Sequence, residues 1–106
     1  MLELSLHILD ALQNSVEAGA SRIVLDIDED PDRDRLEIVI TDNGRGMDRE
    51  MVQKVFHPFV TSRTTRHVGL GIPLFAEAAR RCEGDLVIDS EKNQGTRIKV
   101  WFRWHH

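Results

Sequence analysis

The chain has 106 residues, of which 41% are hydrophobic and 30% are charged, a balance typical of one folded domain spanning residues 1–106. This composition excludes an intrinsically disordered chain. The formal net charge of −4 argues against a general nucleic-acid binder and against a membrane-surface binder.

The first half of the chain predicts a helix, a β-hairpin and a second, short helix. In residues 2–18, leucine and valine recur every three or four positions on one helix face, and Gly19 follows where a C-cap is expected. Residues 21–28 and 36–41 alternate apolar and polar side chains, as half-buried strands do, and an Asp-Pro-Asp turn separates them. Asp48 is predicted to cap a short helix that ends near residue 55.

The second half predicts a loop, a third helix and a second hairpin. Residues 57–68 show no apolar period, whereas residues 71–82 form a predicted helix. Residues 85–90 and 96–101 are predicted strands joined by a turn. Hairpin strands and helices in this order predict an α+β fold, a two-layer α/β sandwich on a mainly antiparallel sheet.

Two polar residues of the first predicted helix are candidates for metal and catalytic chemistry. Asp10 and Asn14 are four positions apart and therefore lie on one helix face. The amide oxygen of Asn14 is a hard ligand suited to Mg²⁺, and the Asp10 carboxylate one turn away could polarise a nucleophile. A solvated helix surface is the alternative interpretation of the same pattern.

The loop after the second predicted strand is a candidate nucleotide-binding segment. Asp42 stands at the end of the strand, where its carboxylate can accept hydrogen bonds from an exocyclic amine such as that of adenine. Gly44 and Gly46 let the backbone approach a flat ring closely, and Met47 completes the segment. An ordinary Asp-Asn-Gly turn is the alternative.

A third candidate segment precedes the third predicted helix. Gly69, Leu70 and Gly71 lead into this helix, whose N-terminal N–H groups can bind an anion. Arg63 and Arg66 lie just upstream, where they could contact phosphate oxygens. The alternative is a connector made flexible by its glycines. The sequence has no P-loop and no complete dinucleotide fingerprint, which excludes those two modes of phosphate binding.

In their order and spacing, these segments together resemble the family of sensor histidine kinases, gyrase and Hsp90 ATPase domains, MutL and the anti-sigma-factor kinases. The stretch from Asp10 to Asn14 is similar to the N box of that family, residues 42–46 to its G1 box, residues 56–61 to the F box of sensor kinases and residues 69–71 to its G2 box. The pair Gly95 and Thr96 matches the Gly-Thr that opens a late strand. The resemblance covers nearly the whole chain.

This resemblance implies a Bergerat-type ATP-binding fold, with a mixed, mostly antiparallel sheet, helices on one face and ATP held between the layers. It implies that Asp42 binds the adenine amine, that Asn14 ligates Mg²⁺ and that Thr96 lies near the adenine. The glycines of the G2 box would receive the phosphates, and residues 57–70 would form a lid over the nucleotide.

The implied activity is ATP-dependent protein phosphotransfer, histidine kinase-like or serine kinase-like. The acceptor is expected on another chain, because no helical hairpin with a phosphoacceptor histidine precedes the N box. Asp10 is the candidate catalytic residue, in a position where the ATPases and serine kinases of the family usually carry glutamate. A hydrolysing ATPase, a nucleotide-sensing module without catalysis and a small protein-interaction domain stay open, as does a homodimer.

The chain is expected to be cytoplasmic. Cys82 is the only cysteine, so an internal disulfide is excluded, and the amino-terminal residues lack the pattern of a signal peptide. No run approaches the roughly 20 apolar residues that a membrane-spanning helix needs. The C-terminal pair of histidines is given no functional role.

Overall fold

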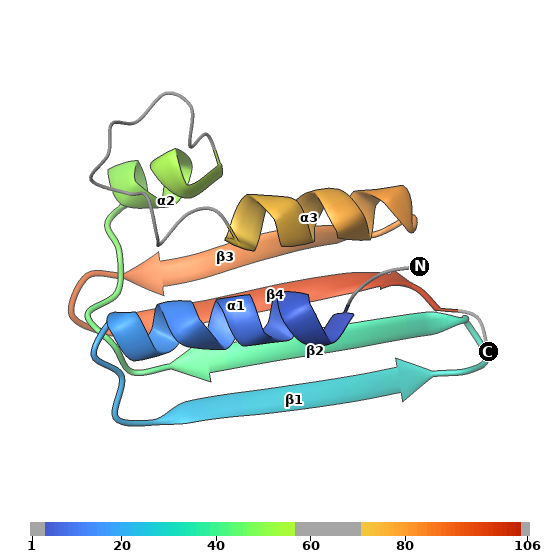
Figure 1. Cartoon of the computed structure of the whole chain (residues 1–106), viewed down its shortest axis with the longest axis horizontal. Coiled ribbons are helices and arrows are strands. Elements are labelled where there is room, and N and C mark those ends of the chain that lie inside the picture. The colour runs from blue at the N-terminus through green and yellow to red at the C-terminus, as the bar shows by residue number, and fades with distance from the viewer. Residues whose placement is uncertain (1–3, 57–70, 105–106) are drawn as a thin grey trace.

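The computed structural model describes residues 4–56 and 71–104 of the chain. Within them it contains three helices and four strands in the predicted order (Figure 1). Their bounds are α1 Leu4–Glu17, β1 Ile23–Asp30, β2 Arg35–Asp42, α2 Arg49–Phe56, α3 Gly71–Arg81, β3 Asp85–Glu91 and β4 Gly95–Arg103. Every predicted helix and strand is therefore present, and the predicted loop lies outside the described residues.

The four strands form one sheet in the order β1-β2-β4-β3. The two predicted hairpins are joined side by side, because their inner strands β2 and β4 pair with each other. The mainly antiparallel sheet is confirmed, since all three strand pairs of the described part are antiparallel. The β2–β4 register sets Asp42, at the end of β2, directly opposite Thr96, near the start of β4.

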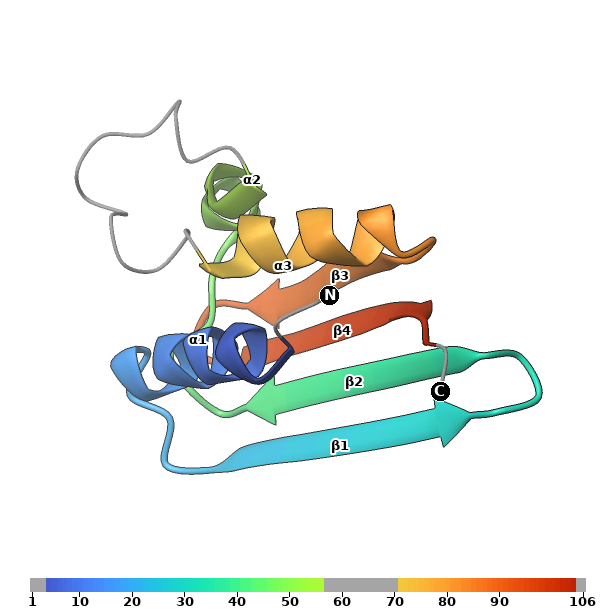
Figure 2. The ribbon, with the colours of Figure 1, turned by 45° about the vertical axis from the view of Figure 1, so that its right-hand side comes forward.

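Helices α1 and α3 cover one face of this sheet, which makes the predicted two-layer sandwich (Figures 1 and 2). Helix α3 packs on β3 and β4, whereas α1 packs on β2. The buried core between the layers consists of Ala11, Leu36, Ile38, Ile40, Ile72, Phe75, Ala76, Ala79, Leu86, Ile98, Val100 and Phe102. In the described part of the chain, no helix is long and apolar enough to cross a membrane.

Two local signals at helix ends are confirmed. Asp48 caps α2, because the N–H of Met51 donates to Asp48 Oδ1 at 2.9 Å. Helix α1 ends in a left-handed residue, Gly19 at φ +77°, and the N–H of Ala20 reaches back to the carbonyl of Ser15 at 3.2 Å. This cap ends α1 close to the loop that follows β2, where the N–H of Arg45 donates to the carbonyl of Ala18.

Strand β1 differs from the prediction in its start and in its burial. It begins at Ile23, because the N–H groups of Ser21 and Arg22 are both taken by Asn43 Oδ1, at 2.9 Å each. The predicted half-burial of the strand is wrong. Leu25 and Ile27 pair with the buried Ile40 and Ile38 of β2, yet they are 40% and 54% exposed. The reason is that neither α1 nor α3 packs over β1 (Figure 1).

The corner between α3 and β3 is fixed by Asp85. Its carboxylate accepts the N–H of Leu86 at 2.8 Å and pairs with Arg80 at 2.9 Å. These contacts, the backbone hydrogen bond first, lower the pKa of Asp85. The ion pair is largely exposed, so it fixes local geometry and adds little to the free energy of unfolding.

Candidate functional site

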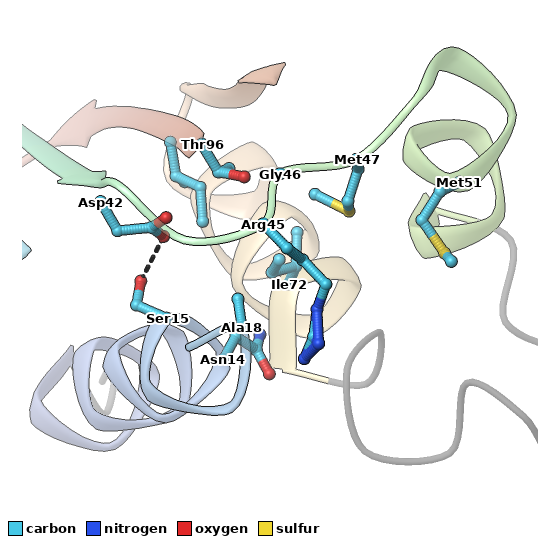
Figure 3. Close-up of a pocket in the computed structure, with 11 residues that line it drawn as sticks. Asn14, Ser15, Ala18, Asp42, Arg45, Gly46, Met47, Met51, Ile72 and Thr96 are labelled. Carbon is cyan, nitrogen blue, oxygen red and sulfur yellow. Dashed lines mark hydrogen bonds between the residues drawn. The ribbon is translucent and has the colours of Figure 1, made fainter. Parts of the chain in front are cut away.

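A pocket of about 320 Å³ opens between α1, the loop after β2, α2, the first turn of α3 and β4. Figure 3 shows the side chains around it. They are Asn14, Ser15, Ala18, Asp42, Arg45, Gly46, Met47, Met51, Ile72, Thr96 and Ile98. A pocket of this volume and mixed lining is typical of a small-molecule site.

Asp42 is the buried carboxylate of this pocket, with 8% of its surface exposed. The hydroxyl of Ser15 donates to Oδ2 at 2.6 Å, and the N–H of Gly44 donates to Oδ1 at 2.8 Å. Each carboxylate oxygen carries two acceptor sites, so one on each oxygen is left unused by these two bonds. The carboxylate is thus held in one orientation and can still accept hydrogen bonds from a ligand.

The hydroxyl of Thr96 is held by a polar cluster beside Asp42. Ser90 Oγ accepts the N–H of Met47 at 2.8 Å and lies 2.7 Å from Thr96 Oγ1. The same Ser90 hydroxyl lies 3.0 Å from the carbonyl of Gly95. Ser90 therefore ties the loop after β2 to the start of β4 and fixes the hydroxyl at the pocket wall.

Asn14 lies on α1 at the other side of the pocket (Figure 3). Its Nδ2 is buried and has no hydrogen-bond partner among residues 4–56 and 71–104. A buried unpaired donor costs about 1–3 kcal/mol, so such an atom in a pocket wall indicates a missing acceptor. The guanidinium of Arg45 donates to the carbonyl of Glu17 at the C-terminus of α1, which holds this cation at the pocket.

The remaining walls are apolar and come from different elements. Ile72 at the start of α3 and Ile98 on β4 are almost completely buried, with 2% and 3% of their surfaces exposed. Met47 and Met51 face the pocket from the loop after β2 and from α2 (Figure 3). Apolar walls next to one fixed carboxylate suit an apolar ligand that carries hydrogen-bond donors on its edge.

Gly46 brings the loop after β2 against the turn between β3 and β4. Its φ is +69°, and a Cβ there would lie 1.9 Å from the carbonyl oxygen of Glu91. The N–H of Asn93 in that turn donates to the carbonyl of Arg45. The loop is therefore clamped between this turn and the end of α1, and only glycine fits at the contact.

The structure brings together five of the predicted site residues, since Asn14, Asp42, Gly46, Met47 and Thr96 all line the pocket. Two more lie next to it. Gly44 binds Asp42 through its N–H, and Gly71 begins α3, where a Cβ would lie 2.7 Å from the Cβ of Asp10.

Asp10 is exposed, one turn before Asn14 on α1, and does not itself line the pocket. Arg63, Arg66, Gly69 and Leu70, together with the predicted lid and residues 57–61 of the predicted F box, lie outside the described residues.

Sequence reasoning missed six lining residues, namely Ser15, Ala18, Arg45, Met51, Ile72 and Ile98. Ser15 is the most informative of them, because it is buried and holds Asp42. The available signal was its position on the apolar side of the helix, where a hydroxyl needs a partner. Ile72 directly follows Gly71 in the third predicted helix, and Ile98 is an apolar residue of the last predicted strand. The sequence therefore identified both as core residues but not as pocket walls.

The comparisons with known proteins concern the family and the fold. The family described as "Histidine kinase-, DNA gyrase B-, and HSP90-like ATPase" matches residues 2–106. The solved ATP-binding domain of PrrB from Mycobacterium tuberculosis superposes with a TM-score of 0.69 and 26% sequence identity, over 97% of this chain and 68% of that one.

Curated relatives include two sporulation kinases of Bacillus subtilis (strain 168). Sporulation kinase D is 35% identical over 63 residues, which is 59% of this chain and 12% of that protein. Sporulation kinase C is 26% identical over 92 residues, which is 87% of this chain and 21% of that protein. The heme sensor protein HssS of Staphylococcus saprophyticus is 26% identical over 93 residues, or 87% of this chain and 20% of that protein.

The chain spans only 12% to 21% of these three relatives. The comparisons therefore concern one domain of them and not their other parts. The match over residues 2–106 and the shared fold are sufficient for the assignment. The chain belongs to the histidine kinase-, DNA gyrase B- and HSP90-like ATPase family, as an ATP-binding domain of that family.

Proposed function

We propose that the pocket binds Mg²⁺-ATP and that the domain, residues 1–106, serves ATP-dependent phosphotransfer to a cytoplasmic protein partner. The observation that carries the proposal is the carboxylate of Asp42. It is buried, fixed by Ser15 and Gly44, and retains acceptor sites in a pocket with apolar walls. A carboxylate in this setting recognises an amine on the edge of a flat base, as the exocyclic amine of adenine is.

In this proposal, the adenine lies between Met47 and Ile98, with its amine toward Asp42. Thr96, whose hydroxyl is held by Ser90, offers a second polar contact beside the carboxylate. Gly46 keeps the loop backbone close to this part of the pocket. Because Ile72 and Ile98 are already buried in the structure, these two wall residues need little ordering on binding.

Asn14 is proposed to hold the metal side of the ligand. Its buried Nδ2 has no acceptor among the described residues, and metal-bound water would provide one, while its Oδ1 is the atom suited to Mg²⁺. Among residues 4–56 and 71–104, no three His, Cys, Asp or Glu side chains gather to hold a metal ion. This fits Mg²⁺, which keeps several waters and binds through one or two protein oxygens plus substrate phosphates, whose charge it neutralises.

The phosphate contacts in the proposal come from the start of α3 and from the segment before it. The N–H groups of the first turn of α3, beginning at Gly71, provide donors for an anion. For Arg63, Arg66, Gly69 and Leu70 the proposal rests on the sequence pattern alone.

Calorimetric titration with ATP, with and without Mg²⁺, tests the metal part of this proposal. Asn14→Ala is expected to leave the affinity for metal-free ATP within about twofold. It is also expected to remove the gain in affinity that Mg²⁺ gives to the parent protein. We expect this gain to be about tenfold, since one charge-assisted contact contributes ~1.4 kcal/mol. The matched control is Gln13→Ala, which removes an exposed amide of the same helix that donates to Glu17 Oε2 at 3.2 Å. A Mg²⁺ effect that survives in Asn14→Ala would refute the role of Asn14.

Asp10 is proposed to orient or deprotonate the attacking group. It lies exposed against the first residue of α3, one helical turn from Asn14. Asp10→Ala is expected to lower phosphate transfer or release by about 100-fold, the usual size of a lost general base, with ATP affinity nearly unchanged. Radiolabelled γ-phosphate measures the rate, and Glu77→Ala on α3 is the control for losing an exposed carboxylate. Turnover equal to that of the parent protein would exclude Asp10 from the chemistry.

The same assay separates phosphotransfer from its alternatives. The relatives named as sporulation kinases favour phosphotransfer over hydrolysis alone. Label that appears on a partner protein supports the kinase, label released only as inorganic phosphate supports a hydrolysing ATPase, and tight binding without either supports a nucleotide-sensing module. Each outcome keeps the ATP site and changes only the step after ATP has bound.

A further inference from the structure

An exposed apolar surface lies on the flank of the domain opposite α3. On α1, Asp10 faces Gly71 of α3, whereas Ala11 and Ser15 face the sheet. At 100° per residue, Leu9 and Val16 then project on the flank of α1 that faces away from α3. With Leu25 and Ile27 of β1 they form a surface, here called the α1–β1 surface, whose four side chains are 40% to 59% exposed.

The edge of β1 beside this surface is open. Strand β1 is at the end of the sheet order, and its only partner strand in the described residues is β2. An edge strand presents a row of N–H and C=O groups that can pair with one more strand. A strand added there would place alternate side chains beside Leu25 and Ile27, on the apolar face of β1.

The opposite face of β1 carries charge that the described residues leave unbalanced. Asp26 and Asp28 point to this face, and neither has an ion-pair partner among residues 4–56 and 71–104. Asp28 lies directly opposite Glu37 of β2, and Glu37 is itself paired with Arg35 and Lys99. Like charges in cross-strand positions are unfavourable, so a cation on the open side of Asp28 would relieve this pair.

This charge pattern decides between two kinds of occupant. A second copy of the chain, paired through its own β1, would bring Asp26 and Asp28 against the same acidic residues. Acidic side chains on an edge strand are one way in which proteins prevent such self-pairing. A strand that alternates apolar side chains with lysine or arginine matches both faces of β1.

We propose that β1 binds, by strand addition, a segment of a partner protein in which apolar side chains alternate with lysine or arginine. The apolar side chains lie beside Leu25 and Ile27 of the α1–β1 surface, and the cations lie beside Asp26 and Asp28. This site is separate from the nucleotide pocket, whose lining contains no residue of β1.

The test uses a capped eight-residue peptide that alternates valine with lysine, titrated into the protein by NMR. Saturable binding with shifts and slowed amide exchange in β1 is expected. Three control peptides are compared: the same composition with lysines and valines in separate blocks, glutamate in place of lysine, and alternate backbone N-methylation. Each is expected to bind at least about tenfold more weakly, because it removes the alternation, the charge match or the backbone hydrogen bonds.

A charge-reversed protein gives the second measurement. Asp26→Lys with Asp28→Lys is expected to lose the lysine peptide and to bind the glutamate peptide. Asp32→Lys with Glu77→Lys makes the same change in net charge at exposed positions off the strand and is expected to keep the parent preference. Circular dichroism confirms that both variants are folded.

Three results would overturn the proposal. They are no saturable binding at millimolar lysine peptide, equal binding of the blocked or N-methylated peptide, and a concentration-dependent dimer in sedimentation that protects the β1 amides. The last result would make a second copy the occupant. Asp42→Asn is expected to bind the peptide like the parent protein. A failure of the strand-addition proposal can therefore be distinguished from a failure of the proposed nucleotide site.

Discussion

Replacing Asp42 by asparagine is expected to weaken ATP binding by about 100-fold, which corresponds to ~2.7 kcal/mol. The N–H of Gly44 requires an acceptor, so the asparagine oxygen takes the place of Oδ1 and the amide nitrogen faces Ser15 and the pocket. A donor then meets the donor amine of adenine, and the charge that strengthened the contact is gone. Because asparagine has nearly the same shape as aspartate, the free energy of unfolding should change far less than the affinity.

A graded series makes this result specific. Ser15→Ala removes only the donor at 2.6 Å from Asp42 Oδ2 and is expected to weaken ATP by about tenfold, because the carboxylate remains but is less firmly oriented. Asp89→Asn is the matched control, since Asp89 is an exposed carboxylate on β3 outside the pocket. Calorimetry measures all three variants. Asp42→Asn binding ATP as tightly as Asp89→Asn would show that the base is recognised elsewhere.

The sequence predicted those parts of the fold that depend on local patterns. The Asp48 cap, the glycine end of α1 and the alternation in β2 each act over a few residues, and all are present as predicted. The pairing of β2 with β4 was not specified locally, because it joins segments more than 50 residues apart. The G1-like loop was identified as a unit because its carboxylate and glycines are adjacent in sequence.

The parts of the site that sequence reasoning missed depend on contacts across the fold. Ser15 matters because it meets Asp42, 27 positions away, and its place on the apolar side of α1 indicates that its hydroxyl needs a partner but not which residue provides it. The exposure of Leu25 and Ile27 was missed for a related reason. Alternation predicts which face of a strand is apolar, but whether a helix covers that face depends on where α1 and α3 pack.

These two misses have one structural origin, the position of α1 over β2. It brings Ser15 and Asn14 to the pocket end of the sheet and at the same time leaves β1 uncovered. The nucleotide pocket and the α1–β1 surface are therefore on different sides of the same helix.

Replacing Gly46 by alanine is expected to have the largest effect on stability of any change discussed, and to remove ATP binding with it. The new Cβ would lie 1.9 Å from the carbonyl oxygen and 2.8 Å from the carbonyl carbon of Glu91, and both are backbone atoms. The loop must therefore move away from the β3–β4 turn, which breaks the contact from Asn93 to Arg45 and displaces Met47 from the pocket wall. We expect the free energy of unfolding to fall by about 3 kcal/mol or more, in the range of severe overpacking.

Gly19→Ala separates this collision from backbone strain. Gly19 has a similar φ of +77°, but a Cβ there would meet nothing within 4 Å. In Gly19→Ala, the free energy of unfolding should therefore fall only by the cost of a left-handed alanine, about 1–2 kcal/mol, and the ATP affinity should be retained. Urea unfolding measures the stability of both variants, and calorimetry below the unfolding transition measures their affinity. If Gly46→Ala lost no more stability than Gly19→Ala, the close packing of the loop on the β3–β4 turn would not hold the pocket, and the fixed position of Asp42 would need another cause.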